Sequence, residues 1–380
     1  MHAMFQGFLP LPICDSHQHI EIRQEAEAAV QTFRYYLDCY GYEKLLILGL
    51  PELSDPTSVF DPTNYLLARY VKHFLPGRVY AFAGPHFQYG GQDTPENLLQ
   101  QLKSAWEMGF DGLKLFNLKP AMRKKLGIAL DDPLFEPMFA YAEEMQIPIT
   151  SHTADPAYFW DLNTPDVEAR KKRGWVYDES FPTRHQIFDE VDRVMKRHPK
   201  LRFCVAHLMC DDEDVRAATR FLSDYPNTAY DLTACASEYT IASSAPEAWR
   251  EFFLRFSDRL HFGTDQKNMP PDENGVPQSW GLTSHLLSRQ YLEAEAPFRW
   301  QDQQMIPLRL PREVIQRIYR DNFVARLGAA PRPIDLEQAK AACDTMTQTI
   351  NSENCPWQLG DYKALDLSNL ATIRNGFAKK

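Results

Sequence analysis

Short apolar runs alternate with longer amphipathic segments along most of this chain. The runs are rich in β-branched and aromatic residues and have the length of buried strands, whereas the segments between them repeat apolar residues every three or four positions, as helices do. The strand-like runs cover residues 13–20, 44–50, 78–85, 112–117, 148–153, 202–208, 228–234 and 259–265. Helical patterns cover residues 25–40, 62–74, 95–108, 133–145, 183–197, 212–225, 246–256 and 311–327, so a predicted helix follows each predicted strand.

Eight strand–helix units predict an α/β protein with the fold of a distorted (β/α)8 TIM barrel. That fold needs about 250 residues, and its strands, which are buried on both faces, read as continuous apolar runs. We place the barrel at residues 13–328 and a C-terminal extension, packed on the barrel or at an oligomer contact, at residues 329–380. Long loops, residues 154–182 and 266–310, follow the fifth and eighth strands and should open on the catalytic mouth of the barrel.

Composition excludes several classes of partner. The 380-residue chain carries a formal net charge of -10 and no long basic stripe, so nucleic acid is not expected to bind. No apolar run reaches the length of a membrane span, and the apolar residues 8–13 contain two prolines without a preceding basic region, unlike a signal peptide. The seven cysteines are scattered without a C-x-x-C pair, which favours reduced thiols in the cytoplasm. We therefore expect a small-molecule substrate and leave a homo-oligomer open.

Two histidines stand one residue apart in the first predicted strand. Successive side chains of a strand point to opposite faces, so His17 and His19 aim their imidazoles at the same side. Two imidazoles that converge in this way can bind one metal ion. Three further residues with metal-binding side chains fall at the carboxyl ends of predicted strands, namely His152, His207 and Asp265. In a barrel these ends ring one mouth, so residues far apart in the sequence meet there.

Each of these residues has an ordinary structural explanation when it is taken alone. A lone histidine at a strand end is more often a hydrogen-bonded core residue than a ligand, and an aspartate can cap a loop. Their joint occurrence at the mouth ends of four strands indicates a metal site. Lys114 lies in the apolar run of the fourth strand and needs a polar partner there.

The whole set resembles the amidohydrolase superfamily in His17-x-His19, His152, His207, Asp265, the Gly263-Thr264-Asp265 strand end and the Arg320-Asp321-Asn322 turn. It looks most like amidohydrolase family 2, which includes aminocarboxymuconate-semialdehyde decarboxylase, over about residues 13–327. The resemblance implies that His17, His19, His152 and Asp265 hold one divalent ion, Zn²⁺ in the first place and Mn²⁺ as the alternative. It also implies that Asp265 accepts a proton from a metal-bound water and that His207 acts beside it as an acid or base.

Lys114 leaves the number of ions open. Binuclear members of the superfamily use a carboxylated lysine on the fourth strand as a bridge, with the sixth-strand histidine on the second ion. Lys114 and His207 supply these residue types, so a second ion is an alternative to a single one. Lys114 can instead serve as an ion-pair partner or contact a substrate carboxylate.

Four other residues are candidates for supporting roles. Asp15 shares the strand face of the two histidines, where it either orients a ligand as a hydrogen-bond acceptor or is a buried polar residue that supports the strand. Asp231, in the seventh strand, is predicted to be a buried carboxylate near the mouth that pairs with Lys114 or holds a water. Phe116 and Trp160 can wall a substrate pocket, although ordinary packing explains aromatic residues as well.

These residues predict a metal-dependent hydrolase that cleaves an ester, lactone or amide of a small molecule with a metal-activated water. Non-oxidative decarboxylation of an unsaturated or aromatic carboxylic acid is the alternative, because the fold does not fix the reaction. His207 would then deliver a proton to carbon. A barrel that only binds or assembles is the remaining alternative, and it predicts a missing ligand or an occluded mouth.

Overall fold

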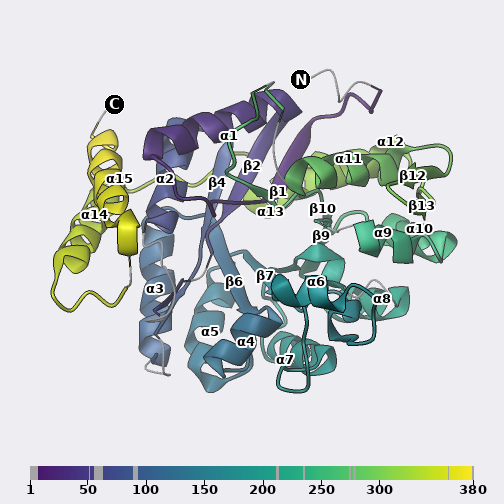
Figure 1. Ribbon diagram of the computed structural model, residues 1–380, viewed down its shortest axis with the longest axis horizontal. Helices are drawn as coiled ribbons and strands as arrows, with labels where there is room; N and C mark the ends of the chain where they lie inside the picture. The colour runs from purple at the N-terminus through teal and green to yellow at the C-terminus, as the bar shows by residue number, and fades with distance from the viewer. Residues whose placement is uncertain are drawn as a thin grey trace.

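The eight predicted strands all form in the computed structural model of this protein, and they make one parallel sheet (Figure 1). They are β1 (Ile13–His19), β2 (Tyr42–Leu48), β4 (Val79–Ala83), β6 (Gly112–Leu118), β7 (Ile149–Thr153), β8 (Phe203–Val205), β9 (Thr228–Asp231) and β10 (Leu260–His261). The structure describes residues 7–50, 52–54, 63–88, 93–210, 214–233, 236–273, 275–276, 280–357 and 359–378. Residues 62, 212–213 and 234, at the ends of three predicted elements, lie outside these ranges.

A short break in the eighth strand is the place where the sheet closes. β10 pairs with β9, and β11 (Gln266–Lys267) pairs with β1. Between these two pieces the backbone N–H of Ser16 donates to the carbonyl of Phe262 at 2.9 Å, and that of Asp265 donates to the carbonyl of His17 at 2.8 Å. One stretch of chain therefore borders both edges of the sheet, which confirms the predicted (β/α)8 barrel and locates its distortion.

A helix follows each strand, within a few residues of the predicted bounds. The helices are α1 (Ala26–Tyr40), α2 (Asn64–Phe74), α3 (Pro95–Glu107), α5 (Glu136–Glu144), α7 (Arg184–Arg197), α8 (Val215–Asp224), α10 (Pro246–Arg255) and α12 (Arg312–Gln316), which runs through a π-helical turn, η5 (Arg317–Asp321), into α13 (Asn322–Leu327). Local residues fix several ends: Thr183 forms a capping box with Gln186 at the start of α7, and Gly41, at φ 72°, ends α1.

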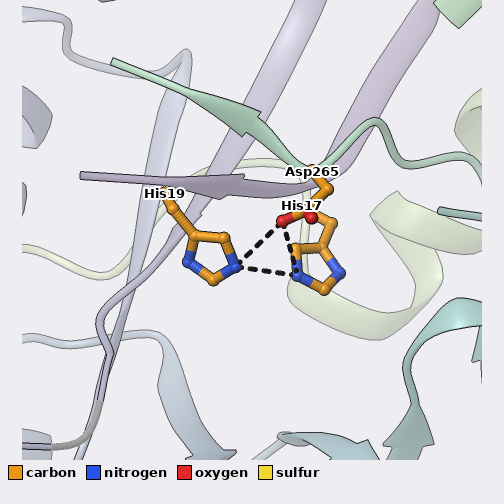
Figure 2. A group of neighbouring side chains, drawn as sticks. All are labelled: His17, His19 and Asp265. Atoms are coloured by element: carbon orange, nitrogen blue, oxygen red, sulfur yellow. Dashed lines mark hydrogen bonds and ion pairs between the residues drawn. The ribbon is translucent and has the colours of Figure 1, made fainter. Parts of the chain in front are cut away.

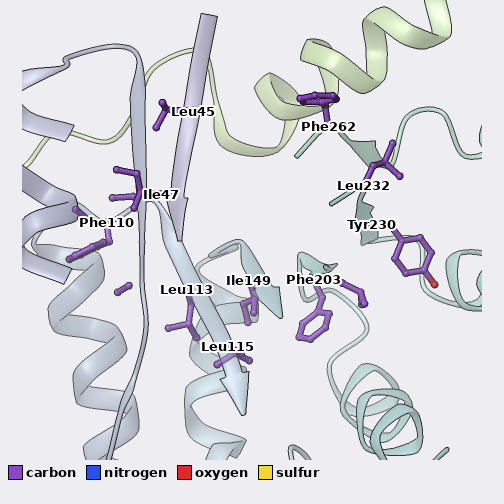
Figure 3. Close-up of a cluster of buried hydrophobic side chains, with 14 of the residues drawn as sticks. Leu45, Ile47, Phe110, Leu113, Leu115, Ile149, Phe203, Tyr230, Leu232 and Phe262 are labelled. Atoms are coloured by element: carbon purple, nitrogen blue, oxygen red, sulfur yellow. The ribbon is translucent and has the colours of Figure 1, made fainter. Parts of the chain in front are cut away.

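Apolar strand residues fill two separate layers. Those shown in Figure 3, such as Leu113 and Leu115 of β6, belong to a large cluster between the strands and the helices. The alternate residues of the strands form a small cluster inside the barrel with Phe323 of α13, and it includes Leu46 and Phe82. Because side chains alternate along a strand, Lys114, between Leu113 and Leu115, points to the interior.

A β-bulge in β1 decides which face its histidines occupy. Between Asp15 and Gln18 strand β1 advances three residues while its partner β2 advances two. The extra residue reverses the alternation, because Cys14 belongs to the interior cluster before the bulge, and His17 and His19 point inward after it. Bulges are frequent beside active sites, since they re-aim side chains in this way.

Both long insertions contain secondary structure that the sequence patterns did not predict. Residues 154–182 hold η3 (Ala157–Trp160) and α6 (Val167–Lys172), and residues 266–310 hold α11 (Trp280–Glu293) and the hairpin of β12 (Phe298–Trp300) with β13 (Gln303–Met305). Further short elements missed by the patterns are β3 (Glu52–Ser54), β5 (His86–Gln88), α4 (Pro120–Leu126) and α9 (Ala236–Ala242). Within the described residues, both insertions therefore carry helices or strands of their own.

The C-terminal extension folds into α14 (Leu336–Asn351) and α15 (Lys363–Gly376), and it packs on the barrel beside α1 and α2 (Figure 1). The Asn369 side chain accepts a hydrogen bond from the backbone N–H of Ala26 at 2.9 Å. The domain boundary and an oligomer contact stay predictions. None of the helices in the described ranges has both the length and the apolar character of a membrane span. Five cysteines are unbridged, namely Cys14, Cys39, Cys204, Cys343 and Cys355.

Candidate metal centre

His17, His19 and Asp265 bring three ligand atoms together at the carboxyl end of the strands (Figure 2). The Nε2 atoms of the two histidines are 3.0 Å apart, and Oδ1 of Asp265 lies 3.6 Å from Nε2 of His17 and 3.3 Å from Nε2 of His19. Two ligand atoms on one zinc ion, each about 2.0 to 2.2 Å from the metal, are roughly 3 to 3.6 Å apart. The spacing of the three side chains therefore fits a shared ion.

The outer nitrogens of both imidazoles are bound to groups that only accept hydrogen bonds. Nδ1 of His17 donates to Oδ2 of Asp231 at 2.8 Å, and Nδ1 of His19 donates to the carbonyl of Leu48 at 2.8 Å. Each Nδ1 thus carries the proton, and each Nε2 turns a lone pair toward the other ring and toward the Asp265 carboxylate. These groups repel one another unless a cation lies between them, so their chemistry fits a metal ion.

His152 and His207 form a second pair of facing nitrogens. Nδ1 of His152 lies 3.0 Å from Nε2 of His207. The far side of each ring again meets an acceptor, since Nε2 of His152 donates to Asp155 at 3.2 Å and Nδ1 of His207 donates to the carbonyl of Thr233 at 3.0 Å. This pair also presents two lone pairs to one point.

The two groups are neighbours, and His17 lies between them. Its ring centre is 5.1 Å from that of His207, and its Nε2 is 3.5 Å from Nζ of Lys114. Within the described part of the chain, His17, His19 and Asp265 are the group whose ligand atoms all lie within 4.8 Å of one another. The structure thus places His152 against His207 rather than in this group, and its part in a four-ligand set stays a prediction.

The protonation states at the centre suit metal binding. Burial lowers the pKa of His17 to about 3 and lowers that of His152 well below its ordinary value. Burial acts to raise the pKa of Asp265, but His19 and the other imidazoles hold it well below its usual range. Burial also lowers the pKa of Lys114 to about 8, against the opposing effect of nearby carboxylates. Neutral imidazoles and an ionised carboxylate are the forms that bind a divalent ion.

Asp231, at the end of β9, connects the two groups. Its Oδ2 accepts from His17, and its Oδ1 accepts from the backbone N–H of His207 at 3.0 Å and from the hydroxyl of Thr233 at 2.6 Å. Burial acts to raise the pKa of this carboxyl, but these partners, His17 first, keep it far below its usual range. The sequence placed Asp231 near the mouth with Lys114 or a water as its partner, and the structure gives it a direct bond to a candidate ligand instead.

Asp15 supports the strands rather than an imidazole. Its carboxylate accepts from the backbone N–H of His17 at 3.0 Å and from the hydroxyl of Thr264 at 2.5 Å. The bulge in β1 separates Asp15 from the face of the histidines, which explains why it contacts no imidazole among the hydrogen bonds of the described residues. Asp15 thus fastens β1 to the residue before Asp265.

His207 and Asp265 have backbone conformations that residues other than glycine rarely adopt. Their φ angles are 60° and 55°, and such positions cost roughly 1 to 3 kcal/mol each and cluster at functional sites. The sequence placed both residues within strands, but β8 ends at Val205 and His207 opens a 3-10 turn, η4 (His207–Cys210). Asp265 lies in the break between β10 and β11. The left-handed conformation re-aims each side chain at the end of its strand.

The two aromatic candidates lie at different distances from the centre. The ring of Phe116 is 5.1 Å from that of His152, so Phe116 borders the site. Trp160 donates to the carbonyl of Pro182 at 3.2 Å and packs on Tyr177, both within the first insertion. Trp160 therefore holds the insertion together, and its contact with a substrate stays a prediction.

Asp155 is a site residue that the sequence reasoning missed. Besides accepting from His152, its carboxylate binds Nζ of Lys119 at 3.0 and 3.1 Å and the hydroxyl of Tyr177 at 2.5 Å. The sequence did offer one signal, because Asp155 follows His152, at the end of a predicted strand, by three positions. No sequence pattern pointed to Thr233. It contacts His207 through its backbone carbonyl as well as its hydroxyl, and a backbone contact does not depend on the type of residue.

Two solved structures share this fold at low sequence identity. IDCase from Metarhizium anisopliae, in its apo form, is 15% identical, with a TM-score of 0.53 over 84% of this chain and 97% of that chain. The 4-oxalomesaconate hydratase LigJ from Rhodopseudomonas palustris is 15% identical, with a TM-score of 0.50 over 88% of this chain and 99% of that chain. A comparison with curated proteins found no match.

The amidohydrolase family model, Amidohydro_2, matches residues 14–323, which is most of the chain. The matched range begins in β1, just before the two histidines, and ends in α13, so it contains nearly the whole barrel and all of its candidate ligands. This protein therefore belongs to the amidohydrolase family of metal-dependent enzymes.

Proposed function

We propose that this enzyme is a hydrolase that cleaves an ester, lactone or amide of a small molecule with a water activated by a divalent ion. The observation that carries the proposal is the set of four imidazoles whose outer nitrogens all meet acceptors, so that each of the two facing pairs turns its lone pairs toward one point at the barrel mouth. We propose His17, His19 and Asp265 as ligands, His152 as a further ligand, and Zn²⁺, with Mn²⁺ as the alternative, as the ion.

The residues around the ion have separate tasks in this proposal. A divalent ion supplies Lewis acidity and lowers the pKa of a bound water. The Asp265 carboxylate stays ionised and its side chain is 26% exposed, so it can accept a proton from a water at the mouth. Thr233 fixes the Nδ1–H of His207, which leaves Nε2 of that ring to exchange a proton with the substrate.

Non-oxidative decarboxylation of an unsaturated or aromatic acid is the second candidate, and two lysines favour it. Nζ of Lys114 lies 3.5 Å from His17 inside the barrel, and Lys119 lies at the rim, bound to Asp155. Their positive charge would attract a substrate carboxylate. His207, with a second proton bound at Nε2, would then deliver that proton to the carbon that loses carbon dioxide.

The number of ions depends on Lys114 and His207. A carboxylated Lys114 could bridge two ions, with His152 and His207 on the second, and the facing nitrogens of these histidines support that arrangement. A single ion needs no modification of Lys114, and we retain it as the first proposal.

Metal analysis combined with assays of a substrate panel tests the proposal. The purified enzyme should contain a divalent metal by mass spectrometry and hydrolyse members of an ester and lactone panel, and chelation should abolish the activity until Zn²⁺ or Mn²⁺ is restored. His17→Ala and Asp265→Asn should lose both metal and activity, whereas His185→Ala, exposed on α7, should keep both. Hydrolysis that survives complete metal removal would contradict the proposal, and carbon dioxide release from aromatic or unsaturated acids without ester cleavage would favour the second candidate.

The variant His207→Asn distinguishes the two ion counts. With one ion, the variant should keep its metal content and lose turnover. With two, the metal content per chain should fall to half.

A further inference from the structure

A groove lies on the outside of the barrel, between α3 and the C-terminal helix α14. Its volume of about 700 Å³ is within the range of small-molecule sites. Leu98, Leu102 and Ala105 of α3 line one side, and Ala342 and Met346 of α14 line the other. None of the candidate metal ligands borders it, so the groove is separate from the metal centre.

Arg69 stands directly behind one wall of this groove. Its side chain extends from α2 and is fully buried. Its Nη1 donates to the thioether sulfur of Met108 at 2.8 Å, and Met108 itself lines the groove, as does Tyr65 one turn earlier on α2. Met108, whose side chain is unbranched and adaptable, thus contacts both the guanidinium and the groove.

This guanidinium lacks an anionic partner in the described part of the chain. Its Nε and Nη2 are buried without a hydrogen-bond partner, and a thioether is only a weak acceptor. Asp335 influences Arg69 electrostatically, but both of its oxygens accept from Gln338 at the start of α14. Proteins normally pair a buried charge, because leaving it unpaired is costly.

The carboxylate of Asp111, near Arg69, already has other partners. Asp111 pairs with Lys72 at 2.6 Å and also accepts the backbone N–H of Arg332 at 2.7 Å. The guanidinium of Arg332 stacks over Trp106, 3.4 Å from the ring centre. Three basic side chains therefore share this region with one buried carboxylate. Besides Met108, the guanidinium of Arg69 contacts the rings of Phe110 and Phe377, whose centres lie 5.4 and 5.8 Å from its carbon.

We propose that the groove binds an amphiphilic carboxylate, with its apolar tail between α3 and α14 and its headgroup on Arg69 in place of the Met108 sulfur. The apolar walls fit an aliphatic chain, and Nη1 of Arg69, once released from the Met108 sulfur, forms with the unpartnered Nη2 the planar pair of donors that a carboxylate binds in bidentate fashion. The site does not depend on the hydrolase proposal, so either can fail without the other.

Calorimetric titration with decanoate and with 1-decanol tests this site, because the two probes share a chain and differ in charge. Decanoate should bind the full-length protein at one site, and decanol should bind at least tenfold more weakly. Arg69→Met, which keeps the length of the side chain, should weaken decanoate at least tenfold and leave decanol unchanged. Ala342→Trp should fill the groove and abolish binding of both.

Two further comparisons separate this site from the metal centre and from loss of folding. His17→Ala should bind decanoate as the wild type does, whereas a headgroup held at the metal centre would be lost in that variant. If Arg69→Met fails to fold, Ala342→Trp decides, since its side chain replaces no buried charge. Decanoate binding that survives Ala342→Trp, equal binding of decanol and decanoate, or no binding of decanoate would each overturn the proposal.

Discussion

Replacing Asp231 with asparagine should weaken metal binding while leaving the barrel folded. Oδ1 of Asp231 accepts from the backbone N–H of His207 and the hydroxyl of Thr233, so the amide oxygen of the asparagine must take that side. The amide NH₂ then faces Nδ1 of His17, where the carboxylate oxygen lay at 2.8 Å. Two N–H groups cannot face each other there, so His17 must move its proton to Nε2.

The size of the effect follows from this change of tautomer. A proton on Nε2 of His17 points into the gap of 3.0 Å to Nε2 of His19 and occupies the lone pair that would bind the ion. Loss of such an outer partner typically costs 10- to 100-fold in metal affinity, or about 1.4 to 2.7 kcal/mol. In the metal-free variant, the asparagine side chain keeps the hydrogen bonds to His17, His207 and Thr233, so the free energy of unfolding should change little.

Chelator competition measures this effect as a dissociation constant for Zn²⁺, and chemical denaturation of the metal-free proteins checks folding. Asp258→Asn makes the same chemical change at an exposed turn and should match the wild type in both measurements. If Asp231→Asn binds Zn²⁺ within twofold of the wild type, the tautomer argument is refuted.

Three further changes test other parts of the structure. Asp155→Asn should weaken metal binding about tenfold or more through His152, and an unchanged dissociation constant would count against that bond. Gly263→Ala would place a Cβ 2.7 Å from Thr233 and 3.1 Å from Cβ of His17, so denaturant titration should show that the free energy of unfolding falls by about 1 to 3 kcal/mol. A variant as stable as the wild type would contradict this expectation. Burial lowers the pKa of His261 from 6.5 to about 3. As the pH falls from 7 to 5, the unfolded chain therefore binds a proton at this residue and the folded chain does not, so the free energy of unfolding should fall by about 2 kcal/mol. His261→Phe should remove that part of the pH dependence, and an equal loss of stability in wild type and variant would contradict it.

The barrel could be predicted because its information is local. Each strand is a continuous apolar run and each helix has its own periodicity, so their order gave the fold without any knowledge of contacts. The inward direction of His17 and His19 followed from the same local rule, since both lie after the bulge in β1. The rule failed for Asp15, because the bulge depends on pairing with β2, which no pattern in β1 records.

The details of the site depend on contacts between distant segments. The sequence patterns placed His207 in a strand, but its own left-handed backbone conformation ends the strand there. No glycine or asparagine stands beside His207 to indicate such a turn. Asp155 was missed because Lys119 and Tyr177, which hold it, come from another strand end and from the first insertion. The helices inside the two insertions were not among the predicted elements, although α11 has 14 residues, as many as α7.

Anomalous diffraction from crystals grown with Zn²⁺ or Mn²⁺ would locate the ion directly. We predict a peak within bonding distance of Nε2 of His17, Nε2 of His19 and Oδ1 of Asp265, and the loss of that peak in His17→Ala. Fully loaded crystals with no peak among these three atoms would contradict the metal centre.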